Sequence, residues 1–141
     1  MTADAPLAVR CLCGEVELAV DAAPVAQFYC HCDDCRVVHG AAYIGVALFE
    51  AEAVRVVRGQ PVLWTHRRMP RGRCPRCGVP LFGDASGAGV IGIKGDRLPP
   101  GHFAPQFHLY CEHAWMPVHD GLPHYRTLPR EFGGDGATVD W

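Results

Sequence analysis

The sequence contains no long apolar run and no excess of charge of either sign, and both absences narrow its function. No run approaches the roughly 20 apolar residues that a membrane-spanning helix needs, so no membrane segment is expected. The formal net charge is −2, so the chain as a whole is not drawn electrostatically to nucleic acid or to an anionic membrane. Residues 1–6 lack the basic and apolar regions of a secretory signal, and we therefore expect a cytoplasmic protein.

Repeats, linkers and low-complexity segments are also missing from the 141 residues. A chain of this length is typical of one domain with one hydrophobic core. We therefore predict a single domain over residues 1–141, with its core at about 7–126. The last dozen residues are expected to form a tail that is either mobile or ordered by contact.

Short apolar segments separated by glycine and proline predict a mainly β fold. Val16, Leu18 and Val20 alternate with other residues, which is the pattern of a half-buried strand. Two acidic residues predict the start of a short helix over 33–38, and Gly40 predicts its end. Further short strands are expected at 25–29, 42–49, 54–57, 62–66, 81–82, 90–93 and 108–112.

Cysteine is the residue type that this chain uses most distinctively. Seven of its eight cysteines lie in three motifs, which are Cys11-x-Cys13, Cys30-x-Cys32-x-x-Cys35 and Cys74-x-x-Cys77. A C-x-C step in extended backbone points both sulfurs to one face, and the turn of a C-x-x-C step brings the next sulfur toward the same point. In a reducing compartment such clusters bind metal or do chemistry more often than they form disulfides, which remain the alternative. Zinc is the usual metal at converging thiolates.

The seven clustered cysteines divide naturally into four and three. Four thiolates make a closed structural zinc site, whereas three leave a position open for chemistry. In one partition Cys11, Cys13, Cys74 and Cys77 close a site and the Cys30 motif stays open. In the other, Cys32 and Cys35 join Cys74 and Cys77 as a zinc ribbon, leaving Cys11, Cys13 and Cys30. We favour the first, because the second leaves Cys30 and Cys32 facing the same way but bound to different metals.

These motifs carry a resemblance to a known family over roughly residues 8–126. The residues concerned are Cys11-Leu12-Cys13-Gly14-Glu15-Val16, Cys30-His31-Cys32-Asp33-Asp34-Cys35-Arg36, Cys74-Pro75-Arg76-Cys77-Gly78-Val79-Pro80-Leu81-Phe82, and His108-Leu109-Tyr110 with Trp115. Together they resemble the glutathione-dependent formaldehyde-activating enzyme family, which has a chromatin-associated branch resembling centromere protein V.

The resemblance implies an Mss4-like β-tent of short antiparallel strands with two zinc ions per chain. It implies that the structural zinc is held by Cys11, Cys13, Cys74 and Cys77, and that the catalytic zinc is held by Cys30, Cys32 and Cys35. The implied activity is that of a carbon–sulfur lyase or synthase, in which glutathione or a similar small thiol adds to formaldehyde or another small aldehyde. We expect the helix start to favour the thiolate of Cys35. The alternative is a non-catalytic two-zinc module that acts as a thiol carrier or chromatin-associated adaptor.

Two residues near these motifs carry separate expectations. His31 lies between two predicted ligands, so its imidazole should point away from the metal into a surface or packing role, with substrate contact as the alternative. Cys111 shares a predicted strand face with Leu109 and should be a buried inert thiol. As the spare cysteine, Cys111 is also the best candidate for a fourth ligand on the open zinc.

The remaining histidines show no metal-binding spacing. Neither H-x-x-H nor H-E-x-x-H occurs, so no histidine metal site is expected. The residues concerned are His39, His66, His102, His108, His113, His119 and His124.

Five arginines surround the last cysteine motif and allow three interpretations. The first is that Arg73 and Arg76 compensate the charge of a four-thiolate zinc. The second is that Arg67, Arg68 or Arg71 recognises the carboxylates of glutathione. The third is a local phosphate-binding patch. We prefer them in this order, since no aromatic residues suited to base stacking are interleaved among the arginines.

Overall fold

The computed structural model describes residues 5–141, and most of its regular structure lies in two sheets. The smaller sheet has the order β1-β2-β5, with all neighbours antiparallel. Its strands are β1 (Leu7–Arg10), β2 (Glu17–Val20) and β5 (Val54–Arg58). The predicted alternation is confirmed, since Val16, Leu18 and Val20 are buried.

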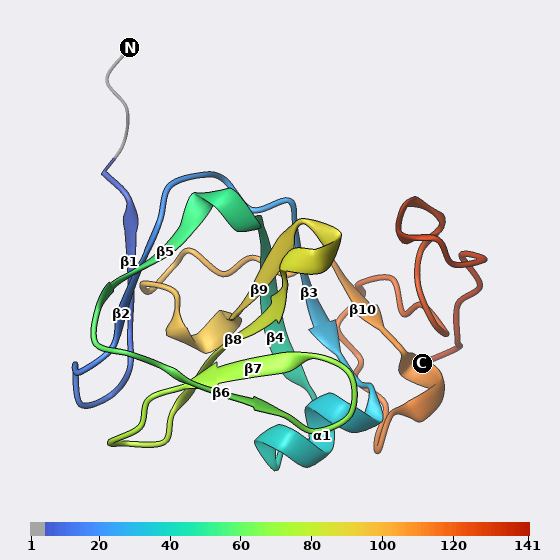
Figure 1. Cartoon of the computed structure of the whole chain (residues 1–141). Coiled ribbons are helices and arrows are strands. Elements are labelled where there is room, and N and C mark those ends of the chain that lie inside the picture. Colours follow the sequence, from blue (N-terminus) through green and yellow to red (C-terminus); the bar gives the residue numbers. More distant parts are fainter. Residues whose placement is uncertain (1–4) are drawn as a thin grey trace.

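The larger sheet has seven strands in the order β10-β3-β4-β9-β8-β7-β6. All neighbours are antiparallel except β10 and β3, which run parallel. Figure 1 shows this sheet between the smaller sheet and the C-terminal segment 114–141. The strands are β3 (Ala26–Cys30), β4 (Ile44–Glu50), β6 (Val62–Thr65), β7 (Pro70–Arg73), β8 (Pro80–Ala85), β9 (Val90–Lys94) and β10 (Phe107–Leu109).

One α-helix, α1 (Asp33–His39), follows β3. Its N-cap is Cys32, whose Sγ accepts the amide of Cys35, and Gly40 ends it with a left-handed backbone (φ 58°). The remaining helical segments are single 3₁₀ turns, η1 (Ala51–Ala53), η2 (Ser86–Ala88), η3 (Gly95–Arg97), η4 (Cys111–His113) and η5 (Arg130–Phe132). The prediction of a mainly β fold with one short α-helix is confirmed. Within residues 5–141, no helix is long and apolar enough to cross a membrane.

Two hydrophobic clusters pack the sheets. The first joins residues of the smaller sheet, such as Val9 and Leu18, to Phe49, Leu81 and Ile93 of the larger sheet. The second surrounds the end of β3 and is built from Ala26, Phe28, Cys30, Cys35, Ile44, Phe107 and Leu109. Residues Tyr125, Leu128 and Phe132 pack against this second cluster, so the C-terminal segment contacts the end of β3.

Two parts of the chain differ from the sequence prediction. The late strand predicted over 108–112 ends at Leu109, because Tyr110 has a left-handed backbone (φ 55°) and Cys111 begins the 3₁₀ turn η4. The amides of Tyr110 and Cys111 donate instead to the carbonyl groups of Thr127 and Tyr125. Strand β7 lies within the arginine-rich segment, where no strand was predicted.

Candidate metal centres and substrate pocket

Four cysteines from two distant segments of the chain meet in one place, called here the four-cysteine group: Cys11, Cys13, Cys74 and Cys77. Their sulfur atoms lie within 4.8 Å of one another, and the Cys11–Cys13 and Cys13–Cys74 Sγ distances are both 3.6 Å. Sulfur ligands about 2.3 Å from a tetrahedral zinc lie about 3.8 Å apart. The group could therefore hold a zinc ion with little rearrangement.

Two similar turns hold these cysteines. The amide of Cys11 donates to the carbonyl of Val16 (3.2 Å), and that of Cys74 donates to the carbonyl of Val79 (3.1 Å). Amides also donate to the sulfurs, from Val16 to Cys11 Sγ (3.3 Å) and from Arg76 and Cys77 to Cys74 Sγ (3.3 and 3.4 Å). Such hydrogen bonds favour thiolates, and backbone hydrogen bonds lower the pKa of Cys77 to about 6.

The end of β5 and the residue that follows it contact the first of these turns and hold it in position. The guanidinium of Arg58 donates to the carbonyl of Gly14 from Nε (3.0 Å) and Nη2 (2.6 Å). Gly59 has φ +73°, and a Cβ there would lie 2.3 Å from the carbonyl oxygen of Glu15. Only glycine fits at this position.

The second set of sulfurs, called here the three-cysteine group, consists of Cys30, Cys32 and Cys35. Cys30 ends β3, Cys32 caps α1 and Cys35 lies in the first helical turn, so a strand and a helix position the group together. The three sulfurs lie within 4.8 Å of one another. This group could also hold a zinc ion.

The ionisation of the three-cysteine group is uneven. Hydrogen bonds from Cys30, then from Cys35, hold the pKa of the Cys32 thiol far below its ordinary value. The pKa of Cys30 is raised, first by its hydrogen bond to Cys32. For Cys35, a hydrogen bond with Cys30 acts downward, but that with Cys32 together with burial raises the pKa to about 11. The neighbouring thiols, followed by the Cys35 amide, thus favour the thiolate of Cys32. The raised pKa of Cys35 is opposite to the expected direction.

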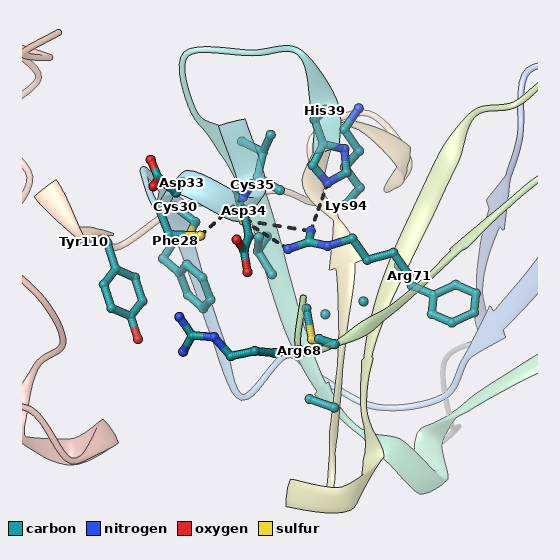
Figure 2. A pocket seen from close by; sticks show the side chains of 18 of the residues that line it. Phe28, Cys30, Asp33, Asp34, Cys35, His39, Arg68, Arg71, Lys94 and Tyr110 are labelled. Atoms are coloured by element: carbon teal, nitrogen blue, oxygen red, sulfur yellow. Dashed lines mark hydrogen bonds between the residues drawn. The ribbon is translucent and has the colours of Figure 1, made fainter. Parts of the chain in front are cut away.

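A cavity of about 550 Å³ opens onto the three-cysteine group. Its apolar wall includes Phe28, Ile44, Val46, Leu48, Met69 and Phe82. Its cations come from the arginine-rich segment and from Lys94 on β9. Figure 2 shows Arg71 reaching from β7 toward Cys35 and His39.

Three arginines line this pocket, and each is bonded differently. Arg67 pairs with Asp34 (3.2 Å). Arg71 directs Nη1 and Nη2 at Cys35 Sγ (3.9 and 3.8 Å), and its Nη1 donates to Nε2 of His39 (3.1 Å). Within residues 5–141, Arg68 makes neither an ion pair nor a side-chain hydrogen bond. Burial raises the pKa of the Tyr110 phenol, and the charge of Arg68 acts to lower it. The pocket therefore holds one arginine that is available to an anionic ligand.

A comparison with known protein families agrees with the presence of these two cysteine groups. Residues 6–113 match the glutathione-dependent formaldehyde-activating enzyme family. The chain belongs to this family. A solved structure of a Rhodobacter sphaeroides protein is similar, with 25% identity and a TM-score of 0.55 over 66% of this chain and 88% of that one. No curated protein matches the chain.

This family member brings the cysteines together in the first of the two predicted partitions. Cys32 and Cys35 lie with Cys30, and the zinc-ribbon alternative, which places them with Cys74 and Cys77, does not form. Arg67, Arg68 and Arg71 line the pocket, whereas Arg73 and Arg76 are exposed outside it. Of the three pocket arginines, Arg68 is the one left without a bonded partner among residues 5–141, so it is the best candidate for the carboxylate-binding interpretation.

Cys111 and His31 take the packing roles expected of them, although Cys111 does so in a turn rather than a strand. Cys111 is buried, and burial raises the pKa of its thiol to about 12. Among the described residues it belongs to neither cysteine group. The His31 ring is fully buried and stacks on Tyr43, with centroids 4.8 Å apart. Neither residue lines the pocket.

Three histidines that are far apart in the sequence come together in the structure. His108 and His124 are both hydrogen-bonded to Asp120, and His31 is hydrogen-bonded to His108. No local spacing announces this cluster, because His31 and His108 are 77 residues apart and meet through the parallel pairing of β3 with β10.

Proposed function

We propose that the protein is a zinc-dependent carbon–sulfur lyase or synthase that forms or cleaves an adduct of glutathione with formaldehyde. One observation carries the proposal: Cys30, Cys32 and Cys35 line the 550 Å³ pocket, whereas no member of the four-cysteine group does. In this proposal the four-cysteine group holds a structural zinc and the three-cysteine group a catalytic one, within one zinc-binding domain.

The zinc at each group would have a different task. At the four-cysteine group the set of thiolates is complete, so the ion would link the turn after β1 to the turn after β7. A zinc held by three thiolates keeps a position for an exogenous ligand and lowers the pKa of a thiol that enters it. The family description supports glutathione as that thiol.

The residues of the pocket would bind and orient the substrates. The free guanidinium of Arg68 is suited to a carboxylate of glutathione, because an arginine can donate two parallel hydrogen bonds to it. Arg71 places a positive charge against Cys35 Sγ, which acts to favour the thiolate forms of Cys32 and Cys35. The apolar wall limits water around the reacting atoms. Holding thiol and aldehyde together supplies much of the rate advantage of such a reaction.

The proposed reaction balances without an oxidant or a reductant. In the forward direction a bond forms between the glutathione sulfur and the aldehyde carbon, and the carbonyl π electrons move to the oxygen. The proton lost by the thiol ends on that oxygen, which gives S-hydroxymethylglutathione. In the reverse direction the carbon–sulfur bond breaks and the same proton returns to sulfur.

Elemental analysis together with a kinetic measurement tests the proposal. Purified wild-type protein should carry two zinc ions per chain, and Cys32→Ser should carry one. Cys111→Ala is the matched control and should keep two, because Cys111 lies outside both cysteine groups.

Exchange NMR of glutathione with formaldehyde then measures how fast the adduct forms and breaks. The wild type should bind glutathione and accelerate exchange, whereas Cys32→Ser should do neither. Zinc-loaded wild type that binds no glutathione and leaves the exchange rate unchanged would refute the enzymatic role. A protein that binds glutathione without accelerating exchange would instead be a thiol carrier.

A further inference from the structure

Behind the three-cysteine group, a chain of hydrogen bonds links three side chains in the order Asp120, His108, His31. Oδ2 of Asp120 lies 2.6 Å from Nε2 of His108, and Nδ1 of His108 lies 2.8 Å from Nε2 of His31. Both rings are fully buried. His124 joins at the side, with its Nε2 3.2 Å from Oδ1 of Asp120. The chain ends at His31, which is covalently placed between Cys30 and Cys32.

The protons of this chain can be assigned from its chemistry. Burial acts to raise the pKa of Asp120, but hydrogen bonds from His108 and from the amide of Leu122 lower it overall, so the carboxyl is ionised. An ionised carboxylate only accepts, so Nε2 of His108 must donate to it. Nδ1 of a neutral His108 then accepts, and Nε2 of His31 donates. The remaining ring nitrogen, Nδ1 of His31, is buried without a partner, which suits a bare lone pair better than an N–H.

The distances favour a hydrogen-bond chain over a metal site. His108, Asp120 and His124 each offer an atom within 4.8 Å of the others, which makes a two-histidine, one-carboxylate metal site conceivable. Nitrogen and oxygen ligands of a tetrahedral zinc, however, lie about 3.3 Å apart, given bonds of about 2.0 to 2.1 Å. The His108–Asp120 distance of 2.6 Å is shorter and is that of a charge-assisted hydrogen bond.

The backbone of His31 is hydrogen-bonded to the same strand, β10, as its side chain. The amide of His31 donates to the carbonyl of Leu109 (3.0 Å), and Leu109 pairs in register with Cys30. Backbone and side chain of His31 are therefore both bonded to β10. In extended backbone His31 faces away from its two neighbours, so its fixed side chain determines where the sulfurs of Cys30 and Cys32 point.

We propose that Asp120, His108 and His31 form a brace that positions Cys30 and Cys32 for metal binding. The brace rests on the proposed function in one respect, namely that the three-cysteine group holds the catalytic zinc. His108 and Asp120 act as positioning residues that touch neither the metal nor the substrate. The C-terminal segment, which carries Asp120, thereby becomes part of the metal site without contributing a ligand.

Asp120→Asn is the sharpest test, because the change is nearly isosteric and removes the charge. Asp120 accepts through both oxygens, so an amide NH₂ at this position must face at least one N–H group. If the NH₂ faces His108, both histidines must move their protons to the other ring nitrogen. Nδ1 of His31 would then be a buried donor without a partner, which destabilises this arrangement.

The affinity for zinc at the three-cysteine group measures the effect. Titration with a chromophoric chelator should show about tenfold weaker binding in Asp120→Asn at this group, with the four-cysteine group unchanged. Asp135→Asn is the matched control, since Asp135 pairs with Arg126 (2.9 Å) in the same C-terminal segment. Unchanged zinc affinity in folded Asp120→Asn would overturn the brace. A wild type that holds three zinc ions and an Asp120→Asn variant that holds two would replace the brace by a metal site.

A measurement on the wild type covers the case in which the variant does not fold. Long-range proton–nitrogen NMR of the histidine side chains reports which ring nitrogen carries the proton. The brace requires Nε2–H in both His108 and His31, and a proton on Nδ1 of His31 would overturn it. Neither readout depends on glutathione, so the brace and the proposed enzymatic role can fail separately.

Discussion

Replacing Arg68 by methionine tests whether the pocket selects thiols that carry a carboxylate. Within residues 5–141, this guanidinium has no anionic partner, although two neighbouring pocket arginines bind Asp34 and Cys35. Arg68→Met keeps most of the side-chain volume and removes the charge. We expect glutathione to bind zinc-loaded Arg68→Met more weakly than the wild type.

The magnitude follows from the environment of the guanidinium. Two unit charges about 4 Å apart attract by about 4 kcal/mol at an effective dielectric constant of about 20. Desolvation of both groups and solvent at the pocket mouth reduce this gain, and a hydrogen bond to a charged group contributes about 1.5 to 3 kcal/mol net. The Kd for glutathione should therefore rise about 10- to 150-fold.

Isothermal titration with two ligands separates the carboxylate contact from a general effect. Glutathione is compared with its diester, which keeps the thiol and loses both carboxylate charges. Arg68→Met should weaken binding of glutathione strongly and binding of the diester hardly at all, so the two changes are not additive. Arg67→Gln removes a charge from the same pocket, but one already paired with Asp34 (3.2 Å), and its effect should be several-fold smaller.

Two results would refute this reasoning. One is an unchanged Kd for glutathione in Arg68→Met. The other is an equal loss for glutathione and its diester, which would mean that the substitution only disturbed the shape of the pocket. The wild-type preference for glutathione over the diester should also shrink as salt is added, because screening weakens a contact at an open pocket.

Three further predictions concern the metal groups and their supports. Zinc binding to the three-cysteine group near neutral pH should release about two protons, because two of its three thiols have raised pKa values. The Kd for zinc should therefore fall about 100-fold for each unit by which the pH rises. Calorimetric titration in buffers of different ionisation enthalpy counts the released protons, and a count near zero would contradict the uneven ionisation. Arg71→Gln should move the thiol alkylation profile of the chelator-treated protein to higher pH, because the guanidinium lies 3.8 Å from Cys35 Sγ, whereas Arg67→Gln should not. Gly59→Ala should lower the free energy of unfolding by more than about 1 kcal/mol in urea titrations, because its Cβ would meet a backbone oxygen at positive φ. Gly87→Ala is the control and should lower the free energy of unfolding far less, because a Cβ there meets no atom within 4 Å. Equal losses in the two variants would contradict the explanation.

The sequence predicted most where the chemistry is local. Ligand spacing gave the three cysteine motifs and left two ways to group them, of which the favoured one is observed. The motifs are local because C-x-C and C-x-x-C steps restrict where neighbouring sulfurs can point. The alternation of Val16, Leu18 and Val20 likewise predicted the buried face of β2 and the residue that precedes it.

What the sequence missed depends on contacts between distant segments. The histidine cluster forms because β10 pairs in parallel with β3, and parallel pairing leaves no turn signal between the strands. The predicted strand through Cys111 ends early because residues 125 and 127 take the amides of Tyr110 and Cys111. From the sequence, the carboxylate-binding interpretation of the arginines ranked second. The sequence does not show that the arginines line a pocket at the three-cysteine group, where Arg71 reaches Cys35.

Strand β7 links the two cysteine groups. Arg71 at one end of this four-residue strand reaches the three-cysteine group, and Cys74, which follows the other end, belongs to the four-cysteine group. Two residues separate Arg71 from Cys74, a span of about 10 Å in extended backbone, so a metal ion at the four-cysteine group would anchor the strand from which Arg71 extends. In the proposed function, loss of the structural zinc would therefore also disturb Arg71 at the three-cysteine group, whereas loss of the catalytic zinc would leave the four-cysteine group in place.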